Sequence, residues 1–221
     1  IVNIVYSNGN KYLFNNYNTY VTNKNYGLRI GSYVLKNESS SHPIALLNND
    51  VSNLITYNVI DNSPIIIKVS GGGFNEPYYN FNDANNNSIN INEFRFMRNR
   101  SYQFDANGIS SSHPFKIFVN NSFTNSISDS SGNISFKINS NHSLQSGTFF
   151  YQCNVHGIMK NNLVLLNRNV INSTNDGNYD FYYGNISVNV INDFNEVSIY
   201  CYYHGYMGEE NLLKYDNTCT I

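Results

Sequence analysis

The stretch TFFYQCNVHGIMK (residues 148–160) joins an alternating strand pattern to a Cys, a His and a Met spaced three residues apart. A second stretch, YCYYHGYMG (residues 200–208), repeats that spacing with Cys201, His204 and Met207, in a chain that has only three Cys and three Met. Thiolate, imidazole and thioether are ligands of soft and borderline metal ions. Two copies of the same spacing therefore indicate two metal-binding loops.

Strand-forming residues surround both loops. β-branched and aromatic residues alternate in short runs bounded by Asn, Ser and Gly, while Ala and Glu are scarce, so the sequence predicts an all-β protein built from β-sandwiches. Alternation places Phe149, Tyr151 and Cys153 on one core-facing side of their strand, and Cys201 ends the matching strand of the second copy. The predicted strands are residues 1–6, 32–35, 64–73, 100–104, 114–119, 134–138, 148–153, 162–166, 186–190 and 197–201.

Two further motifs also occur twice, and their order is informative. SSSHP occurs at 39–43 and 110–114, and GNIS occurs at 132–135 and 184–187. One Cys-His-Met loop follows each GNIS, so both copies of SSSHP precede both loops. Tandem repeats would alternate the two motifs, whereas this order is typical of one unit nested inside another.

Nesting predicts where the chain divides. An inner domain, residues 61–167, is expected to be inserted into an outer domain made of residues 1–60 and 168–221. Insertion at an exposed loop is tolerated when the ends of the inserted unit lie close together. Each domain then holds one SSSHP and one Cys-His-Met loop.

The combined ligand types indicate copper. A thiolate, two imidazoles and a weak axial thioether describe the trigonal, axially capped copper site used for electron transfer. Zinc is the weaker alternative, because it binds Cys and His but gains little from a Met. The Met in each loop therefore favours copper.

In these motifs the sequence resembles the cupredoxins, the blue-copper-like proteins, and the short loop is similar to that of amicyanins. SHP paired with YCYYHGYMG looks like the cupredoxin-like proteins of large DNA viruses and algae. The resemblance covers the chain as two copies and implies Greek-key β-sandwiches with copper at one pole. It implies one ligand set in each domain: His42, Cys201, His204 and Met207 in the outer domain, and His113, Cys153, His156 and Met159 in the inner domain.

Two departures from the family pattern stand out. Blue-copper proteins usually follow the first His with an Asn that ties the two ligand loops together, but Pro43 and Pro114 stand there in this chain. Lys160 follows the inner Met, where the outer copy has Gly208. Both departures bear on the rigidity and redox tuning of the sites.

An oxidase or reductase is not expected. The His-x-His motifs of a trinuclear copper cluster do not occur in the sequence, and the site Cys are flanked by Gln152, Asn154, Tyr200 and Tyr202 rather than by His. The spare His142 lies in a polar run that predicts a solvated loop. We therefore expect a non-enzymatic protein.

Three other features have ordinary interpretations. The glycines of SGGGF (70–74) are expected to form a turn, because the stretch opens no helix and lacks the Lys-Ser/Thr pair of a phosphate-binding loop. Met97 is expected to pack in a core or at a strand edge. Cys219 stands apart near the C-terminus as a plain thiol.

The composition limits the partners. Charged residues make up 13% of the chain and the formal net charge is −2, which gives no broad electrostatic reason to expect nucleic acid or an anionic membrane. No apolar run approaches the roughly 20 residues of a membrane-spanning helix. The expected partners are a redox partner, neighbouring capsid or surface proteins, or further copies in a homo-oligomer.

Two uses of the protein stay open from the sequence. One is a copper-binding redox protein that transfers electrons or holds copper at two mononuclear sites. The other is a structural or interaction module of a virion or cell surface, in which the metal sites are stabilising staples or vestigial. The Asn-rich composition and the virus-like motif favour a virion surface or an extracellular location over the cytoplasm.

Overall fold

The regular structure is built from β-strands, as the sequence predicts. In the part of the chain that is described, the only other regular element is one 3-10 turn, Asn49–Val51. No helix in that part is long and apolar enough to cross a membrane. Residues 39–41 of the first SSSHP motif and Cys219 lie outside the described residues. The computed structural model describes residues 2–7, 11–14, 20–37, 42–60, 63–142, 145, 147–171 and 175–218.

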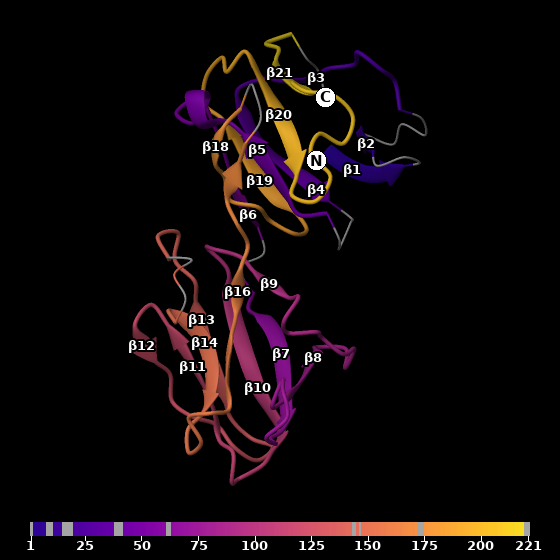
Figure 1. Ribbon diagram of the computed structural model, residues 1–221. Helices are drawn as coiled ribbons and strands as arrows, with labels where there is room; N and C mark the ends of the chain where they lie inside the picture. Colours follow the sequence, from indigo (N-terminus) through magenta and orange to yellow (C-terminus); the bar gives the residue numbers. More distant parts are fainter. Residues whose placement is uncertain are drawn as a thin grey trace. The chain divides into compact units, whose positions relative to one another are not determined.

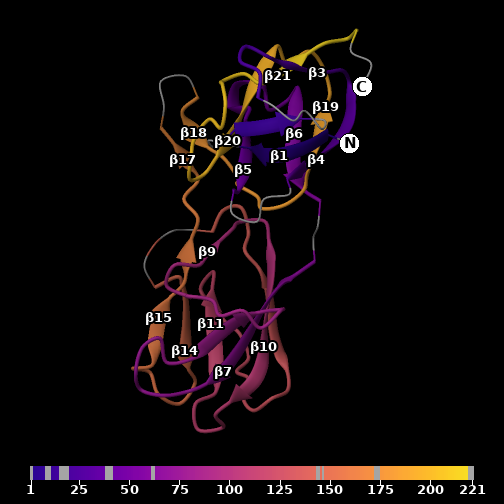
Figure 2. The ribbon, with the colours of Figure 1, turned by 90° about the vertical axis from the view of Figure 1, so that its right-hand side faces the viewer.

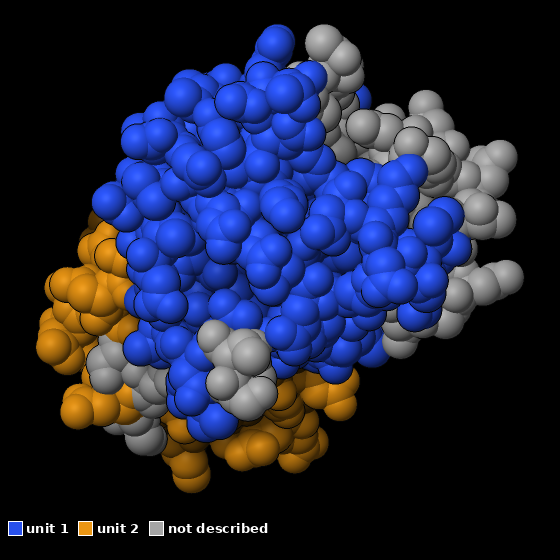
Figure 3. Space-filling view, turned by 90° about the horizontal axis from the view of Figure 1, so that it is seen from above, with its two compact units in different colours: residues 1–61, 168–221 blue, residues 62–167 orange. Residues whose placement is uncertain are grey.

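The chain divides into two compact units (Figure 3). Residues 1–61 and 168–221 form the first, here called the outer unit, and residues 62–167 form the second, the inner unit. The expected inner domain begins one residue earlier and ends at the same position. The Greek-key order of the strands and the origin of the units by insertion stay predictions.

The described strands of the outer unit form three sheets (Figure 1). The five-stranded sheet has the order β2 (Lys11–Phe14), β1 (Val2–Ser7), β4 (Gly31–Asn37), β19 (Ile186–Val190), β6 (Ile55–Val59). The four-stranded sheet has the order β3 (Tyr26–Leu28), β21 (Leu213–Tyr215), β20 (Glu196–Cys201), β5 (Ile44–Leu47). The two-stranded sheet pairs β17 (Asn169–Val170) with β18 (Gly177–Asn178).

The described strands of the inner unit also form three sheets (Figure 2). One has the order β13 (Asn133–Lys137), β10 (Ser101–Ile109), β7 (Ile65–Gly71), β8 (Asn80–Asp83). The second has the order β12 (Ser122–Phe123), β11 (Phe115–Val119), β14 (Phe149–Cys153), β15 (Lys160–Asn162). The third pairs β16 (Val164–Leu165) with β9 (Arg95–Phe96).

The two units share a pattern of strand pairing. β1 runs parallel to β4 in the outer unit, and β7 runs parallel to β10 in the inner unit. On its other side, β4 pairs antiparallel with β19, and β10 pairs antiparallel with β13. β19 and β13 are the strands that begin in the two GNIS motifs. In the second sheet Cys201 lies opposite Ile44, and Cys153 lies opposite Phe115. The register therefore brings each site Cys beside the segment that carries the SSSHP His.

Each unit has its own apolar core. Phe149, Tyr151 and Cys153 are buried together in the inner core, as the alternating pattern predicts. Cys201 is fully buried in the outer core. Met97 is also buried, in agreement with its expected packing role.

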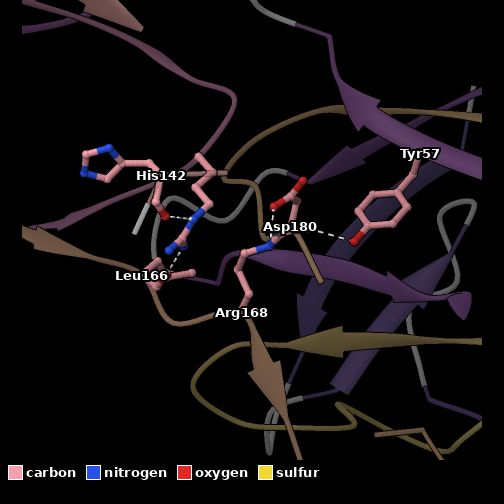
Figure 4. Close-up of polar contacts among 6 residues, drawn as sticks. Tyr57, His142, Leu166, Arg168 and Asp180 are labelled. Atoms are coloured by element: carbon pink, nitrogen blue, oxygen red, sulfur yellow. Dashed lines mark hydrogen bonds and ion pairs between the residues drawn. The ribbon is translucent and has the colours of Figure 1, made fainter. Parts of the chain in front are cut away.

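The expectation of a solvated His142 is wrong. Its side chain is only 3% exposed, and its Nδ1 contacts the Oδ1 of Asn120. Its backbone carbonyl accepts a hydrogen bond from the Nε of Arg98 at 3.0 Å, and another nitrogen of the same guanidinium donates to the Leu166 carbonyl at 2.9 Å (Figure 4). The buried arginine needs acceptors from distant segments, so this loop packs inward.

In the outer unit, an ion pair holds Arg168, the first residue after the inner unit. The Nε of Arg168 lies 2.8 Å from a carboxylate oxygen of Asp180 (Figure 4). The Tyr57 hydroxyl donates to the backbone carbonyl of Asp180 at 2.9 Å. Burial is the main reason why the pKa of Tyr57 is raised well above its usual value, so this phenol stays a donor.

Candidate metal centres

Three ligand atoms converge in the outer unit. His42 lies two residues before β5, Cys201 ends β20, and His204 follows in the loop. The Cys201 Sγ lies 3.6 Å from the Nδ1 of His42 and 3.6 Å from the Nδ1 of His204, and the two nitrogens lie 3.0 Å apart. His42 and Cys201 are buried, whereas His204 is exposed. The three side chains form a group that can hold a metal ion.

The inner unit repeats this arrangement. The Cys153 Sγ lies 3.6 Å from the Nδ1 of His156 and 4.0 Å from the Nδ1 of His113, and the two nitrogens lie 3.1 Å apart. In both sites the imidazole centroids are 4.7 Å apart, at interplanar angles of 47° in the outer site and 45° in the inner site. Each predicted His-Cys-His group is thus brought together within its own unit.

The distances fit a metal ion bound by all three side chains. Bonds of about 2.0–2.1 Å to imidazole nitrogen and about 2.3 Å to thiolate are usual, so ligand atoms at tetrahedral to trigonal angles stand about 3.3–3.8 Å apart. The nitrogen–sulfur distances of 3.6–4.0 Å fall in or next to that range, and the nitrogen–nitrogen distances of 3.0 and 3.1 Å lie just below it. Two imidazole nitrogens this close need a proton or a cation between them.

The predicted axial ligands, Met207 and Met159, are buried in the same apolar clusters as the site Cys. The Cys153 N–H donates to the Met159 carbonyl at 3.0 Å, and the Met159 N–H donates to the His156 carbonyl at 3.1 Å. The Met207 carbonyl accepts the N–H of Tyr12 at 2.9 Å. Both backbones are therefore tied close to their sites, while the role of each thioether as a fourth ligand stays a prediction.

A backbone hydrogen bond ties the two ligand segments of each site. The Pro43 carbonyl accepts the N–H of Tyr202 at 3.0 Å, and the Pro114 carbonyl accepts the N–H of Asn154 at 2.7 Å. Each bond joins the residue after the first His to the residue after the Cys. The main chain therefore makes the connection that an Asn side chain would be expected to make in a blue-copper protein.

Backbone amides point at both thiols. The N–H groups of Val155 and His156 donate to the Cys153 Sγ at 3.4 and 3.3 Å. The amides of Tyr203 and His204 do the same for Cys201. Burial raises the pKa of the Cys201 thiol, and the amides oppose this rise because they favour the thiolate. The thiolate is the form that binds metals.

The buried imidazole of the outer site is held neutral. Burial lowers the pKa of His42, and the neighbouring His204 lowers it further. Metal ligation requires a neutral imidazole, so protons compete less well at this ligand than at an exposed histidine.

Two inner-unit residues beside the site were not predicted. Phe74 lies edge-on to both imidazoles, with ring centroids 5.2 Å from His113 and 5.3 Å from His156. At Gly72, a Cβ would lie only 2.9 Å from the Cβ of His113. The expected turn is only partly seen, because Ser70 and Gly71 belong to β7 and the connection to β8 begins at Gly72. Gly72 and Phe74 form one wall of the inner site.

Two tyrosines beside the site Cys were also not predicted. Tyr12 lies next to Cys201, and Tyr79 lies next to Cys153. A signal for them exists in the sequence, because Tyr-x-Phe-Asn occurs at 12–15 and again at 79–82. This fourth repeated motif marks the same place in both units.

No protein-family model, curated protein or solved structure matches this chain. The cupredoxin resemblance therefore stays a prediction. The geometry of the two sites carries the functional conclusion that follows.

Proposed function

We propose that this chain is a copper-binding, cupredoxin-like protein with two mononuclear sites, each formed by two His, one Cys and one Met. It transfers electrons or holds copper, and it does not catalyse a reaction. The observation that carries the proposal is that two separate units place a Cys Sγ and two His Nδ1 atoms at nearly the same distances.

The ligand types support copper over zinc. A thiolate, two imidazoles and a weak thioether suit both oxidation states of copper, so electron exchange requires little rearrangement. A structural zinc site would complete its tetrahedron with a fourth Cys or His. Both Met of the loops are instead buried beside their sites, at 0% and 1% exposure.

The burial of the outer ligands suits electron exchange. Cys201 and His42 are shielded from water, which protects the thiolate. His204 reaches the surface, so one ligand ring can contact a redox partner while the thiol stays enclosed. This asymmetry favours electron transfer over simple storage for the outer site.

A structural role is the second candidate. Cys201 and Met207 belong to the same core cluster as residues far away in the sequence. A metal bound there would join these segments and add its binding free energy to folding. On a virion or cell surface, where we place the protein in this alternative, such a staple would be useful without any redox change.

Metal titration tests the proposal. The metal-free chain is expected to bind two Cu(II) ions and to show an intense thiolate-to-copper absorption band that disappears on reduction and returns on oxidation. Cys153→Ser and Cys201→Ser should each leave one copper per chain, and the double variant should lose the band. Zinc binding with no coloured copper complex would overturn the copper proposal. Copper that stabilises the fold but cannot be reduced reversibly would favour the structural role.

A further inference from the structure

One tyrosine stands at the same place in each unit. Tyr12 lies on β2, which pairs with β1 at the edge of its sheet, and Tyr79 directly precedes β8, which pairs with β7 at the edge of the equivalent sheet. Both side chains are 2% exposed and belong to the apolar cluster that contains the site Cys. The fold therefore delivers one phenol to each thiol.

The outer phenol has no conventional acceptor. Among the described residues, the buried Tyr12 hydroxyl has no hydrogen-bond partner. The N–H of Tyr12 donates to the Met207 carbonyl at 2.9 Å, and its side chain belongs to the same core cluster as Cys201, whose thiol lies beside it. A phenol is protonated at neutral pH, so this buried hydroxyl can donate a hydrogen bond to a nearby thiolate.

The inner phenol already has an acceptor. The Tyr79 hydroxyl donates to the backbone carbonyl of His113 at 2.9 Å. Its ring lies edge-on to Phe115 and Tyr151, with centroid distances of 5.1 and 6.0 Å, which hold it in place. Cys153 lies next to the same hydroxyl.

A phenol has a single proton to donate. The Tyr12 hydroxyl can donate its hydrogen bond to the Cys201 sulfur, because an ionised thiolate accepts a far stronger hydrogen bond than a neutral thiol does. The Tyr79 hydroxyl can donate to the Cys153 sulfur only if its hydrogen bond to the His113 carbonyl is broken. The carbonyl would then lose this donor. Two equivalent tyrosines thus face two different demands.

We propose that Tyr12 is a positioning residue of the outer site, whose O–H donates to the metal-bound Cys201 thiolate, whereas Tyr79 braces the backbone of the inner ligand His113. The inference rests on the proposed function, because it concerns the thiolate form of the metal-bound site. It makes the two sites unequal in redox behaviour although their ligand types are identical.

The expected consequence is a higher reduction potential at the outer site. A hydrogen bond to the thiolate withdraws electron density from the sulfur, so the oxidised metal is stabilised less. Removal of the bond should move the thiolate-to-copper band to longer wavelength and lower the potential. Since hydrogen bonds to charged groups are individually strong, we expect about a tenfold change in the ratio of oxidised to reduced copper at fixed potential, or about 59 mV for a one-electron couple.

The test uses the full chain with one site at a time. Tyr12→Phe is made in a Cys153→Ser background, which keeps only the outer site, and Tyr79→Phe is made in a Cys201→Ser background. Tyr12→Phe should move the band to longer wavelength and lower the potential, with a matching change of about tenfold in the ratio of the Cu(II) to the Cu(I) affinity. Tyr79→Phe should leave the band in place but release copper faster, because His113 loses its brace.

The outcomes separate the inference from the proposed function. If neither parent chain forms a coloured copper site, the proposed function fails. If the parents form such sites but Tyr12→Phe leaves the band and potential unchanged, the role of Tyr12 is wrong. A crystal structure of the copper-loaded chain judges the contact directly: the Tyr12 Oη is expected within hydrogen-bond range of the Cys201 Sγ, and a larger separation would overturn the inference.

Discussion

The outer and inner sites reach one ligand geometry through two loop conformations. In the outer loop the Cys201 N–H donates to the Gly205 carbonyl at 2.8 Å, and Gly205 has a φ of +70°. In the inner loop the Cys153 N–H donates instead to the Met159 carbonyl at 3.0 Å, so a longer stretch is enclosed. Both sites share the strand register and the hydrogen bond that the Pro carbonyl accepts from the residue after the Cys, so these features hold the candidate ligands in place.

The residues that follow the two loops differ, Lys160 in the inner unit and Gly208 in the outer unit, and the structure explains this difference. Lys160 opens β15, which pairs antiparallel with β14. Gly208 has a φ of +130°, and a Cβ there would lie 3.1 Å from the ring of Tyr20. The inner chain therefore continues directly into a strand, whereas the outer chain needs glycine to turn first.

Gly72→Ala should have the largest effect, because it should weaken copper binding at the inner site and leave the outer site unchanged. The residue has a φ of +126°, and its new Cβ would lie 2.9 Å from the Cβ of His113. Strain of about 1–3 kcal/mol should displace that ligand and lower copper affinity at the inner site by about tenfold or more. The measurement is a copper titration against a competing chelator in a Cys201→Ser background.

Gly73→Ala is the matched control for this change, because a Cβ at Gly73 would meet no atom within 4 Å. The same Gly72→Ala change in a Cys153→Ser background should leave the outer site unaffected. Equal affinity of the Gly72→Ala and Gly73→Ala chains would show that this wall does not position His113.

Gly205→Ala should destabilise the outer loop, whereas the equivalent change in the inner loop, Gly157→Ala, should have little effect on stability. An L-residue at a φ of +70° costs about 1–2 kcal/mol, so Gly205→Ala should lower the unfolding free energy of the outer unit by that amount. At Gly157 a Cβ would meet only the end of the Gln152 side chain, at 3.2 Å, which can move aside. Urea unfolding of the metal-free variants measures both effects. Equal losses would mean that the loops share one conformation in solution.

His142→Gln should have the smallest effect and should act on the inner unit alone. Burial lowers the pKa of His142, and the charge of Arg98 lowers it further. The unfolded chain takes up a proton below about pH 6.5 while the folded chain resists, so stability is lost as the pH falls through that value. The loss is at most about 1.4 kcal/mol per pH unit.

Urea unfolding of the metal-free chain at about pH 7.5 and about pH 5.5 measures this pH dependence. The parent chain should lose more stability over that interval than His142→Gln. His42 in the outer unit also has a lowered pKa, so some loss should remain in the variant. An unchanged pH dependence would argue that His142 is protonated freely in the folded state.

Much of the fold could be predicted because strand patterns are local. Each of the ten predicted strand ranges overlaps a strand of the structure. β5 was missed although it follows His42, because all four of its residues are buried and no alternation remains to be seen. The prediction for His142 is wrong for a different reason. Its polar neighbours in the sequence indicate a solvent-exposed loop, but a hydrogen bond from Arg98 to the His142 carbonyl holds this loop against the inner unit.

The candidate metal ligands of the two loops could be predicted from the sequence, because Cys, His and Met lie within seven consecutive residues and the same spacing occurs twice. The donors and acceptors around them come from remote segments, and no local pattern reveals them. Tyr12 meets Cys201, and Tyr79 meets the carbonyl of His113, only after the strands have paired. The sequence thus indicates which side chains can bind metal, because it contains the ligand types at a repeated spacing. Only the tertiary structure decides which acceptor each tyrosine hydroxyl can reach, because these acceptors come from distant segments.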